Sequence, residues 1–534
     1  MSAILETPTL ETPAFDLDAF VAAHERKDLL RFITCGSVDD GKSTLLGRLL
    51  WETGLVAEDH IAALHTASRR HGTQGSDLDL ALLVDGLAAE REQGITIDVA
   101  YRFFSTAKRR FIVADTPGHE QYTRNMATGA STADLAILLV DARSGPTPQT
   151  RRHALVASML RVRHVVVAIN KMDLVAWSES VADSISVRMR ALCDGLGFDS
   201  LAVIPLSALS GENVVTQGTS APWYRGRTLL EHLESVPVLA AEPGPFRLPV
   251  QRVNRPDPSF RGVSGTIASG VVRVGDAVRI LPAGQSAQVA RIVAPSGDVA
   301  AAGDGAAVTI VLDRPVDVSR GDVLADPHHP AHVGREMRAR LQWFDEAPGR
   351  VGARYLLKLG TRSVTAHVTG IAGRVALDTM QIEPASSLAI NDIGDVTLSL
   401  ERSIAYDSYA DSRELGGFLL IDPETFDTVA LGLVQDAREP MREAPTAMAP
   451  TAKALAVTTP APTEAPMATE STLRSVYKTI SWRVVGSIDT TLVAWLLTGS
   501  FRASLAIGGV EMFTKSILYF MHERVWLRVR IGQK

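Results

Sequence analysis

The residues best suited to chemistry begin with a glycine-rich loop near the start of the chain. Gly36–Ser43 has the sequence GSVDDGKS, the pattern GxxxxGK[ST], between an apolar run, LLRFITC, and a helix-compatible run, TLLGRLLW. Phosphate oxygens need several backbone N–H donors at close range. Glycines allow that approach, and a following helix N-terminus adds a favourable dipole. We expect Lys42 to reach the β- and γ-phosphates and Ser43 to bind Mg²⁺. The expected phosphate loop is Gly36, Ser37, Val38, Asp39, Asp40, Gly41, Lys42, Ser43 and Thr44.

A second candidate segment is DTPG, at Asp115–Gly118, directly after the apolar run FIVA. A carboxylate at the end of such a strand can hold a metal ion through water, and the Gly118 N–H can meet a γ-phosphate. Alone the segment is also compatible with an ordinary turn. The residues that we assign here to the nucleotide are Asp115, Thr116, Pro117 and Gly118.

Two further segments suit the recognition of a base. NKMD, at Asn170–Asp173, follows the apolar run VVVAI, and Ser207 follows LAVIPL. A carboxylate at Asp173 can accept two hydrogen bonds from guanine N1 and N2, which adenine cannot donate. A backbone N–H at Ser207 or Ala208 could meet guanine O6. NKMD alone is also compatible with a helix N-terminus. The residues assigned to the base are Asn170, Lys171, Met172, Asp173, Ser207, Ala208 and Leu209.

These segments need a scaffold that brings the ends of several strands together. Short apolar runs alternate with helix-compatible segments from about Leu29 to Leu209, which predicts an α/β domain with a parallel sheet. After Pro243 the chain has short Val-rich runs broken by Gly, Pro and Asp. This pattern predicts two antiparallel β-barrel domains, with a break near the charged stretch Gly334–Arg340.

The four segments, in this order and each at the end of a strand, resemble a GTPase of the translation-factor class. The resemblance identifies Glu92–Ile97 (EQGITI) as the first switch segment. It also implies that the Thr96 hydroxyl completes the coordination of Mg²⁺ together with Ser43 and Asp115. His119 is implied to contact the nucleotide and, as the catalytic residue, to position the attacking water.

Longer strings are more specific. CGSVDDGKSTLLGRLL at Cys35–Leu50 and DTPGHEQYTRNMATGASTADLAILLVDAR at Asp115–Arg143 resemble the GTPase large subunit of bacterial sulfate adenylyltransferase, the CysN type. The likeness covers about Arg26–Gln435 and departs from the family pattern modestly at Glu414–Gly417. It implies that the chain binds and hydrolyses GTP with Mg²⁺. A separate small subunit would join sulfate to ATP, giving adenylyl sulfate and pyrophosphate.

Composition narrows the function classes. The 534 residues are 46% hydrophobic and 21% charged, with a net charge of −6, which favours a globular protein of several domains. Residues 471–534 carry nine Lys and Arg against three Asp and Glu, so the rest of the chain has a net charge of −12. An acidic body argues against the alternative of a translation factor that carries tRNA. Two cysteines, and no basic segment ahead of an apolar run at the N-terminus, favour the cytoplasm.

The C-terminal part differs from the rest. Glu439–Glu470 is rich in Pro, Ala and Thr, which predicts an extended linker. Beyond it, Trp482–Leu497 and Ala503–Phe520 are apolar stretches near the lower length limit for spanning helices, and basic residues at both ends favour a hairpin with its termini in the cytoplasm. The region resembles a small, uncharacterised bacterial membrane domain. A soluble or interfacial hairpin stays open, as does a membrane-bound regulatory GTPase without an enzyme partner.

The expected organisation has six parts, with the protein tethered to the cytoplasmic face of the inner membrane. These are an N-terminal extension (1–27), a P-loop GTPase domain (28–242), two β-barrel domains (243–332 and 333–437), a linker (438–470) and a two-helix membrane domain (471–534).

Overall fold

The computed structural model describes residues 27–54, 61, 64–65, 68, 78–84, 90, 96–238, 244–257 and 260–435. The chain divides into two units, Met1–Arg442 and Glu443–Lys534, and every described residue belongs to the first. The predicted extension up to residue 26, the linker and the membrane domain therefore lie outside the described residues, as do residues 91–95 at the first switch. No helix within the described ranges is long and apolar enough to cross a membrane.

The first domain is built on a six-stranded sheet in the order β2-β3-β1-β4-β5-β6. All neighbouring strands are parallel except β2, which runs antiparallel to β3 at the edge. The strands are β1 (Leu29–Cys35), β2 (Ala100–Ser105), β3 (Arg110–Asp115), β4 (Leu135–Asp141), β5 (His164–Asn170) and β6 (Ser200–Pro205). The α-helices are α2 (Lys42–Glu52), α5 (Thr123–Ala130), α6 (Pro148–Met159), α7 (Glu179–Cys193) and α8 (Leu229–Ser235), and the 3₁₀ turns are η1 (Leu80–Leu83), η2 (Glu120–Tyr122) and η3 (Met172–Val175).

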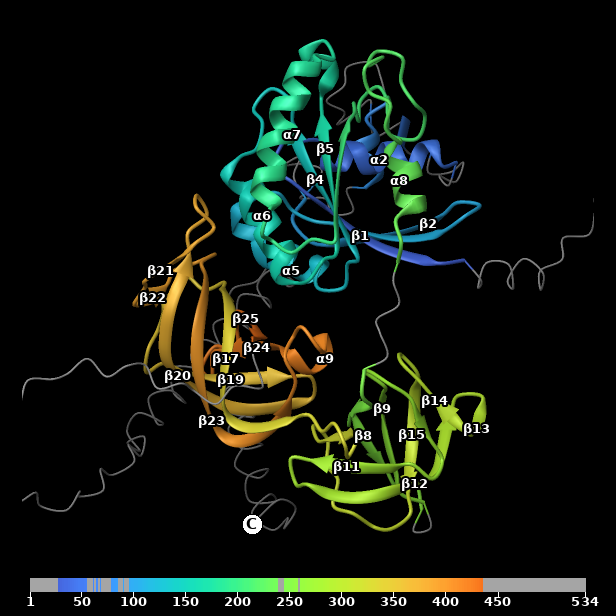
Figure 1. Ribbon diagram of the computed structural model, residues 1–534, viewed down its shortest axis with the longest axis vertical. Coiled ribbons are helices and arrows are strands. Elements are labelled where there is room, and N and C mark those ends of the chain that lie inside the picture. The colour runs from blue at the N-terminus through green and yellow to red at the C-terminus, as the bar shows by residue number, and fades with distance from the viewer. Residues whose placement is uncertain are drawn as a thin grey trace, which may run out of the picture. The chain divides into compact units, whose positions relative to one another are not determined.

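Helices cover this sheet, as Figure 1 shows. Every residue of β4 and β5 is buried, which explains why these strands are continuous apolar runs and do not alternate. Along β1 the side chains do alternate between two cores, with Leu30 and Phe32 in one and Ile33 and Cys35 in the other. Because β1, β3, β4 and β5 are parallel, the polar residues that follow them meet at one edge of the sheet.

The second domain is an antiparallel β domain in which strands pair in the order β7-β16-β11-β12-β15-β9-β8. Its core contains Leu248, Ile280, Ile292 and Ile310, all fully buried. The strands are β7 (Arg247–Pro249), β8 (Arg252–Asn254), β9 (Gly262–Thr266), β10 (Val272–Arg273), β11 (Ala277–Leu281), β12 (Gln285–Ala294), β13 (Gly297–Val299), β14 (Ala301–Ala302), β15 (Ala307–Leu312) and β16 (Val323–Ala325).

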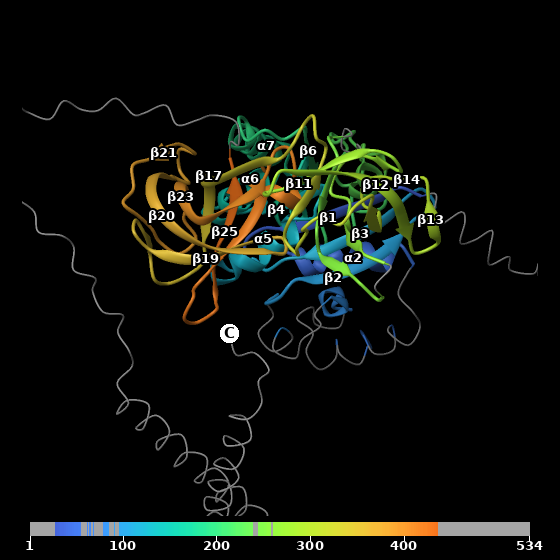
Figure 2. The same ribbon diagram turned by 90° about the horizontal axis from the view of Figure 1, so that it is seen from below.

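The third domain is a closed antiparallel barrel. Its strands pair in the order β19-β24-β25-β17-β23-β20, and β20 pairs back to β19. Figure 2 shows these yellow and orange strands curving round a common interior, which Trp343 and Phe418 fill. The strands are β17 (His332–Trp343), β18 (Gly349–Arg350), β19 (Arg354–Leu359), β20 (Arg362–Val375), β21 (Ile382–Glu383), β22 (Ser387–Leu388), β23 (Ile393–Tyr406), β24 (Gly417–Ile421) and β25 (Thr428–Val434), with the short helix α9 (Arg413–Gly416).

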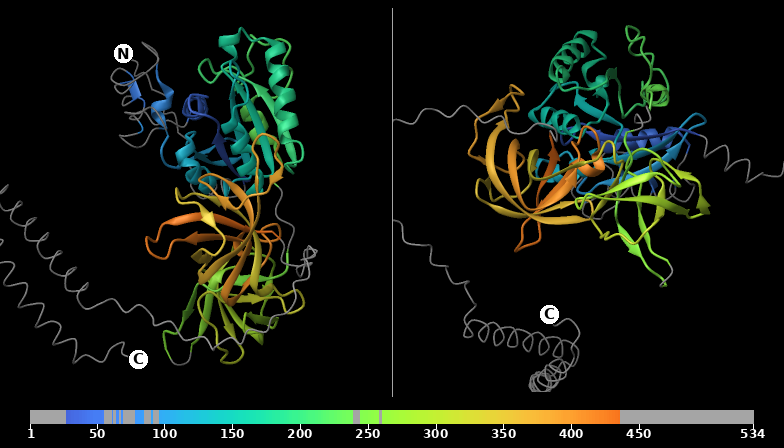
Figure 3. Two further views of the ribbon diagram at one scale, coloured as in Figure 1. Left: turned by 90° about the vertical axis from the view of Figure 1, so that its left-hand side faces the viewer. Right: turned by 60° about the horizontal axis from the view of Figure 1, so that its bottom comes forward.

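The predicted architecture of an α/β domain followed by two antiparallel β-barrel domains is confirmed in the described residues. In both views of Figure 3 the blue-to-green domain holds the long coloured helices, whereas the green-to-orange domains consist almost entirely of strands. The predicted boundary between the two β domains, after residue 332, lies at the start of β17, and the preceding strand β16 ends at Ala325; the charged stretch Gly334–Arg340 itself belongs to β17. Its charged residues alternate with buried ones such as Met337 and Ala339, as expected for a strand with one face in water.

The third domain also packs against the α/β domain. Ile393, Tyr409 and Leu433 belong to the same core cluster as helices α5, α6 and α7. Arg413 donates from Nη2 to the carbonyl oxygen of Arg161 over 2.6 Å. The segment that departs from the family pattern, Glu414–Gly417, therefore lies beside an anchor between two domains.

Candidate nucleotide-binding site

The glycine-rich loop connects β1 to α2 and needs glycine for a steric reason. Gly41, the N-cap of α2, has φ +91°, and a Cβ there would come within 2.5 Å of the Asn170 side-chain nitrogen. The backbone therefore turns in a left-handed conformation where no side chain has room. This places the start of α2 at the carboxyl edge of the sheet, as the phosphate-loop prediction requires.

Lys42 lies at the centre of this loop. Its side chain is 7% exposed, and Nζ donates to the carbonyl oxygens of Ser37 over 2.8 Å and Gly36 over 3.3 Å. Burial lowers the pKa of Lys42, while the nearby carboxylates of Asp115 and Asp40 act in the opposite direction. A buried ammonium group beside the backbone of a glycine-rich loop is suited to an anionic ligand.

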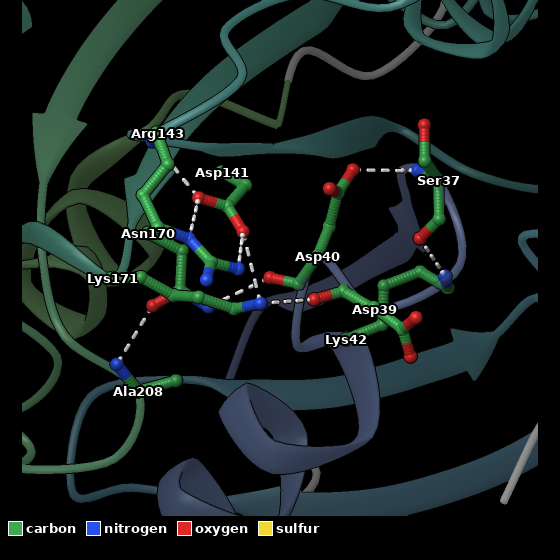
Figure 4. Close-up of polar contacts among 9 residues, drawn as sticks. All are labelled: Ser37, Asp39, Asp40, Lys42, Asp141, Arg143, Asn170, Lys171 and Ala208. Atoms are coloured by element: carbon green, nitrogen blue, oxygen red, sulfur yellow. Dashed lines mark hydrogen bonds and ion pairs between the residues drawn. The ribbon is translucent and has the colours of Figure 1, made fainter. Parts of the chain in front are cut away.

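Asp40 stabilises the loop from within. Its Oδ2 accepts the backbone N–H of Ser37 over 2.6 Å, as Figure 4 shows. Burial raises the pKa of Asp40 to about 6, although the bond from Ser37 and the charge of Lys42 favour the carboxylate. The loop therefore contains a carboxyl group that titrates in the mildly acidic range.

Hydroxyl and carboxylate oxygens gather beside the loop. Ser43 Oγ lies 3.4 Å from Thr96 Oγ1, which lies 3.3 Å from Asp115 Oδ2. Thr34, at the end of β1, donates its hydroxyl to Asp115 Oδ1 over 2.7 Å. Burial raises the pKa of Asp115, and the hydrogen bond from Thr34 opposes this. The structure thus brings together the three predicted metal ligands, and an all-oxygen set of this kind fits the preference of Mg²⁺.

That set is not a self-sufficient metal cage. No group of three or more His, Cys, Asp or Glu side chains suited to a metal occurs in the described part of the chain. Mg²⁺ is commonly held by one or two protein groups together with phosphate oxygens and water. The oxygens of Ser43, Thr96 and Asp115 fit an ion that arrives with a phosphate ligand.

The DTPG segment passes very close to the phosphate loop. A Cβ on Gly118 would collide with Lys42 Nζ and would lie 2.8 Å from the carbonyl oxygen of Gly36. Thr116 anchors the segment by donating its hydroxyl to the carbonyl oxygen of Thr34 over 2.6 Å. Position 118 therefore requires glycine, because the DTPG segment and the phosphate loop leave no space between them for a side chain.

His119 follows this glycine, and its side chain is turned to its own 3₁₀ turn. Nδ1 accepts the backbone N–H of Gln121 over 3.2 Å, and the ring contacts Tyr122 at 5.9 Å between centroids. Its side chain has no hydrogen bond to the phosphate loop within the described residues. The structure places the His119 backbone beside Gly118, whereas the predicted role of its imidazole stays a prediction.

Asn170 joins the phosphate loop to the base-binding segments. Its Nδ2 donates to the Asp40 carbonyl oxygen over 2.8 Å, and its Oδ1 accepts the Ala208 N–H over 2.9 Å. Figure 4 shows that these bonds bring three distant segments together. Ser207 N–H donates to the Glu212 carbonyl oxygen over 3.2 Å. Both N–H groups predicted to face guanine O6 are therefore used inside the protein in this structure, and their contact with the base stays a prediction.

Asp173 is the residue whose environment best indicates a base. Its Oδ1 is buried and has no hydrogen-bond partner among the described residues. A buried carboxylate oxygen without a donor is costly, so the site is built for a ligand that donates. Guanine N1–H and N2–H are donors of the required kind. Leu209, the last of the predicted base residues, is 49% exposed, and its N–H has no acceptor in the described structure.

Lys171 connects the NKMD segment to the phosphate loop. It takes a left-handed conformation with φ +63°, and Nζ donates to the Asp39 carbonyl oxygen and lies 3.0 Å from Asp141 Oδ2. Burial alone would raise the pKa of Asp141, but hydrogen bonds from Arg143 and Lys171 outweigh it and hold that pKa well below its usual range. Figure 4 shows this group of charged side chains.

The remaining predicted residues mainly support the loops. Met172 and Pro117 are buried, Thr44 is half-buried at the start of α2, and Val38 is 36% exposed. The sequence reasoning missed Thr34, Asp141, Arg143 and His153. Asp141 had a usable signal, since it ends the apolar run LAILLVD at the same edge of the sheet. His153 had none, because it is 117 residues from the loop that it contacts.

Comparison with known proteins matches this architecture part by part. The family described as "Elongation factor Tu GTP binding domain" matches residues 27–238, "Elongation factor Tu domain 2" matches 261–325, and "GTP-eEF1A C-terminal domain-like" matches 336–435. Sulfate adenylyltransferase subunit 1 of Methylorubrum extorquens (strain PA1) is 55% identical over 449 residues, which is 84% of this chain and 95% of the relative. The chain belongs to the sulfate adenylyltransferase subunit 1 family.

Other relatives support this membership. Sulfate adenylyltransferase subunit 1 of Saccharophagus degradans is 50% identical over 430 residues, covering 80% of this chain and 91% of the relative. The bifunctional enzyme NodQ of Rhizobium sp. (strain N33) is 53% identical over 416 residues, covering 78% of this chain and 64% of the relative. The predicted resemblance to the sulfate adenylyltransferase GTPase subunit is thereby confirmed. Residues 476–527 match a family described as "Predicted membrane protein (DUF2061)".

Proposed function

We propose that this chain is the GTP-binding and GTP-hydrolysing subunit of a sulfate adenylyltransferase. GTP hydrolysis would be coupled to formation of adenylyl sulfate and pyrophosphate from ATP and sulfate, with a separate small subunit acting on ATP and sulfate. One observation carries the proposal: proteins named sulfate adenylyltransferase subunit 1 are 55% identical over 84% of this chain. Formation of adenylyl sulfate is uphill, so a second nucleotide gives a physical reason for a GTPase subunit.

The phosphates of GTP would lie along Gly36–Thr44, with Lys42 against the β- and γ-phosphates. Ser43, Thr96 and Asp115 would hold Mg²⁺, which supplies positive charge to phosphate oxygens when it is bound. Gly118 would present its N–H to the γ-phosphate. The absence of a side chain lets its backbone come this close to the phosphate loop. His119 would orient the attacking water after a rotation away from the bond with Gln121.

The base would be recognised by Asp173, whose Oδ1 lacks a donor among the described residues. Guanine N1–H and N2–H would supply donors to this carboxylate, which adenine cannot do. The N–H of Leu209 would face guanine O6, since the N–H groups of Ser207 and Ala208 are already used. Selectivity for GTP over ATP then follows from leaving a carboxylate unpaired with the wrong base.

The γ-phosphate would also control the contact with the third domain. Glu120, in the turn after DTPG, accepts from Asn391 Nδ2 over 3.2 Å through its backbone carbonyl. Arg124, one turn further, donates to the Thr428 carbonyl oxygen over 2.8 Å. Loss of the γ-phosphate would release Gly118 and Thr96, and these contacts link that release to the third domain.

The decisive experiment joins the chain to its partner. Co-expressed chain and small subunit should co-purify and release pyrophosphate from ATP and sulfate faster when GTP is present. Lys42→Ala should abolish the stimulation by GTP while co-purification persists, and Lys358→Ala, at an exposed position of β19, should behave as wild type. An equal rate of sulfate-dependent pyrophosphate release with and without GTP would contradict the proposal. Failure of the two chains to associate would also contradict it.

We further propose that residues 471–534 tether this subunit to the cytoplasmic face of the inner membrane. The match of residues 476–527 to a family described as a predicted membrane protein supports this, together with the basic residues at both ends of the hairpin. The full-length chain should sediment with membranes, and a chain truncated after Thr451 should not. Full-length protein wholly in the soluble fraction, unchanged by the truncation, would refute the tether.

A further inference from the structure

A buried histidine contacts the phosphate loop from the side. His153, on α6, has no exposed surface, and its Nδ1 accepts the backbone N–H of Gly36 over 3.0 Å. Gly36 is the first residue of the phosphate loop. An N–H can only donate, so this contact requires an unprotonated Nδ1 on His153.

The imidazole is held in that state by its surroundings. Burial lowers the pKa of His153 to about 3, and the positive charges of Lys42 and Arg152 act in the same direction. The ring is therefore neutral near pH 7, and because Nδ1 accepts the Gly36 N–H, its single proton is on Nε2. His153 is a permanent acceptor for the loop rather than a group that changes charge.

The contact determines the orientation of the Gly36 backbone. The N–H of Gly36 is held by His153 and its carbonyl oxygen accepts from Lys42 Nζ over 3.3 Å. There is little room for another arrangement, because a Cβ on Gly36 would lie 3.0 Å from the Leu139 carbonyl oxygen and 3.0 Å from Asp40 Oδ2. Loss of the acceptor would leave a buried N–H without a partner and would favour rotation of this peptide.

Helix α6 makes a second contact with the next residue of the loop. The hydroxyl oxygen of Thr147, the N-cap of α6, lies 2.6 Å from the hydroxyl oxygen of Ser37. The helix is itself tied to two other parts of the molecule. Arg152 pairs with Glu120 over 2.7 Å, and Arg151 donates to the Asp378 carbonyl oxygen in the third domain over 3.0 Å. Three consecutive side chains of α6 thus contact the third domain, the turn after DTPG and the phosphate loop.

We propose that His153 is a positioning residue for the phosphate loop and that its bond to Gly36 determines how long a guanine nucleotide stays bound. The bond keeps the start of the loop in the conformation seen here, in which Asp40 holds the Ser37 N–H and Lys42 holds the Gly36 carbonyl oxygen. The anchored helix α6 provides the fixed support. This inference rests on the proposed binding of GTP and GDP at this site.

The test compares two substitutions in the full-length chain. His153→Phe keeps a buried ring and removes the acceptor, whereas His153→Asn keeps an acceptor oxygen near the position of Nδ1. The rate at which fluorescent GDP is displaced by excess GDP should rise about tenfold or more in His153→Phe. It should stay within about threefold of wild type in His153→Asn. His232→Phe replaces a half-buried histidine on α8 that has no bond to the loop, and it should leave the rate unchanged.

Thermal unfolding without nucleotide separates positioning from packing. Equal GDP dissociation rates in His153→Phe and wild type would overturn the proposal. Equal acceleration in His153→Phe and His153→Asn, in proportion to a loss of thermal stability, would also overturn it, because the histidine would then only fill space. Failure of the wild-type chain to bind fluorescent GDP would instead refute the proposed function, which distinguishes the two.

Discussion

The approach of Gly118 to the phosphate loop makes a quantitative prediction for Gly118→Ala. The added methyl would lie 2.8 Å from the Gly36 carbonyl oxygen and 2.8 Å from the Ser37 carbonyl carbon. Ordinary contact begins at 3.4 Å, so one of the two loops must withdraw by about 0.6 Å. Both neighbours are backbone atoms, which cannot move aside by a rotation about a side-chain bond.

Overpacking of this kind costs about 1–3 kcal/mol, which corresponds to about 5- to 150-fold in affinity. We expect the close approach to persist when Gly118 meets the γ-phosphate and to relax when the γ-phosphate is absent, so Gly118→Ala should weaken binding of a non-hydrolysable GTP analogue by that factor. GDP lacks the γ-phosphate and should bind nearly as in wild type. The observable is therefore the ratio of the two affinities.

Competition against a fluorescent nucleotide measures both affinities on one preparation. Gly370→Ala is the matched control, because a methyl there would meet nothing nearer than 3.9 Å and should leave the ratio unchanged. An unchanged ratio in Gly118→Ala would refute the reasoning, since it would mean that the GTP-bound state does not use the close approach seen here.

Three further predictions concern individual side chains of the site. Asp173→Asn should lower the preference for GTP over xanthosine triphosphate by about tenfold or more, because an amide offers a donor where guanine also donates; a retained guanine preference in competition binding would show that another group recognises the base. His119→Ala should leave the GTP affinity near normal and slow single-turnover hydrolysis by about 10²-fold or more, and unchanged turnover would remove His119 from the mechanism. The pKa of Asp40 is raised to about 6 from its ordinary value of 3.8, which means that the folded state binds a proton more tightly than the unfolded state. Its stabilising contribution is complete below about pH 4 and is lost as the pH rises through about 6, lowering the free energy of unfolding by about 3 kcal/mol. Denaturant unfolding of the nucleotide-free protein should show Asp40→Asn gaining stability relative to wild type over this range, and parallel pH profiles would contradict the assignment.

Much of the site was predictable because its parts are local in sequence. The GxxxxGK[ST] loop, DTPG and NKMD each follow an apolar strand, and parallel pairing places the ends of those strands at one edge. Ser43, Thr96 and Asp115 were predicted as metal ligands from motifs and from family resemblance, and their oxygens do lie together. The role of the charged stretch Gly334–Arg340 was harder to predict, since it has the charge of a connector but the alternation of a half-exposed strand.

Other features depend on contacts between distant parts of the chain. The use of the Ala208 N–H by Asn170 follows from the turn between β6 and the next segment, and no local pattern encodes it. The same holds for His153, which sits in an ordinary helical run and acquires its role only when α6 packs beside the loop after β1.

The sequence by itself determined which chemical groups are present and which strand each of them follows, because strand periodicity and loop motifs are short-range properties. Tertiary structure decided which of those groups are free to meet a ligand. Asp173 Oδ1 is left without a donor among the described residues, the Ala208 N–H is used by Asn170, and Gly118 has no space for a side chain. The physical reason is that hydrogen-bond satisfaction and close packing depend on neighbours brought together from different strands and helices, which the order of residues along one segment does not specify.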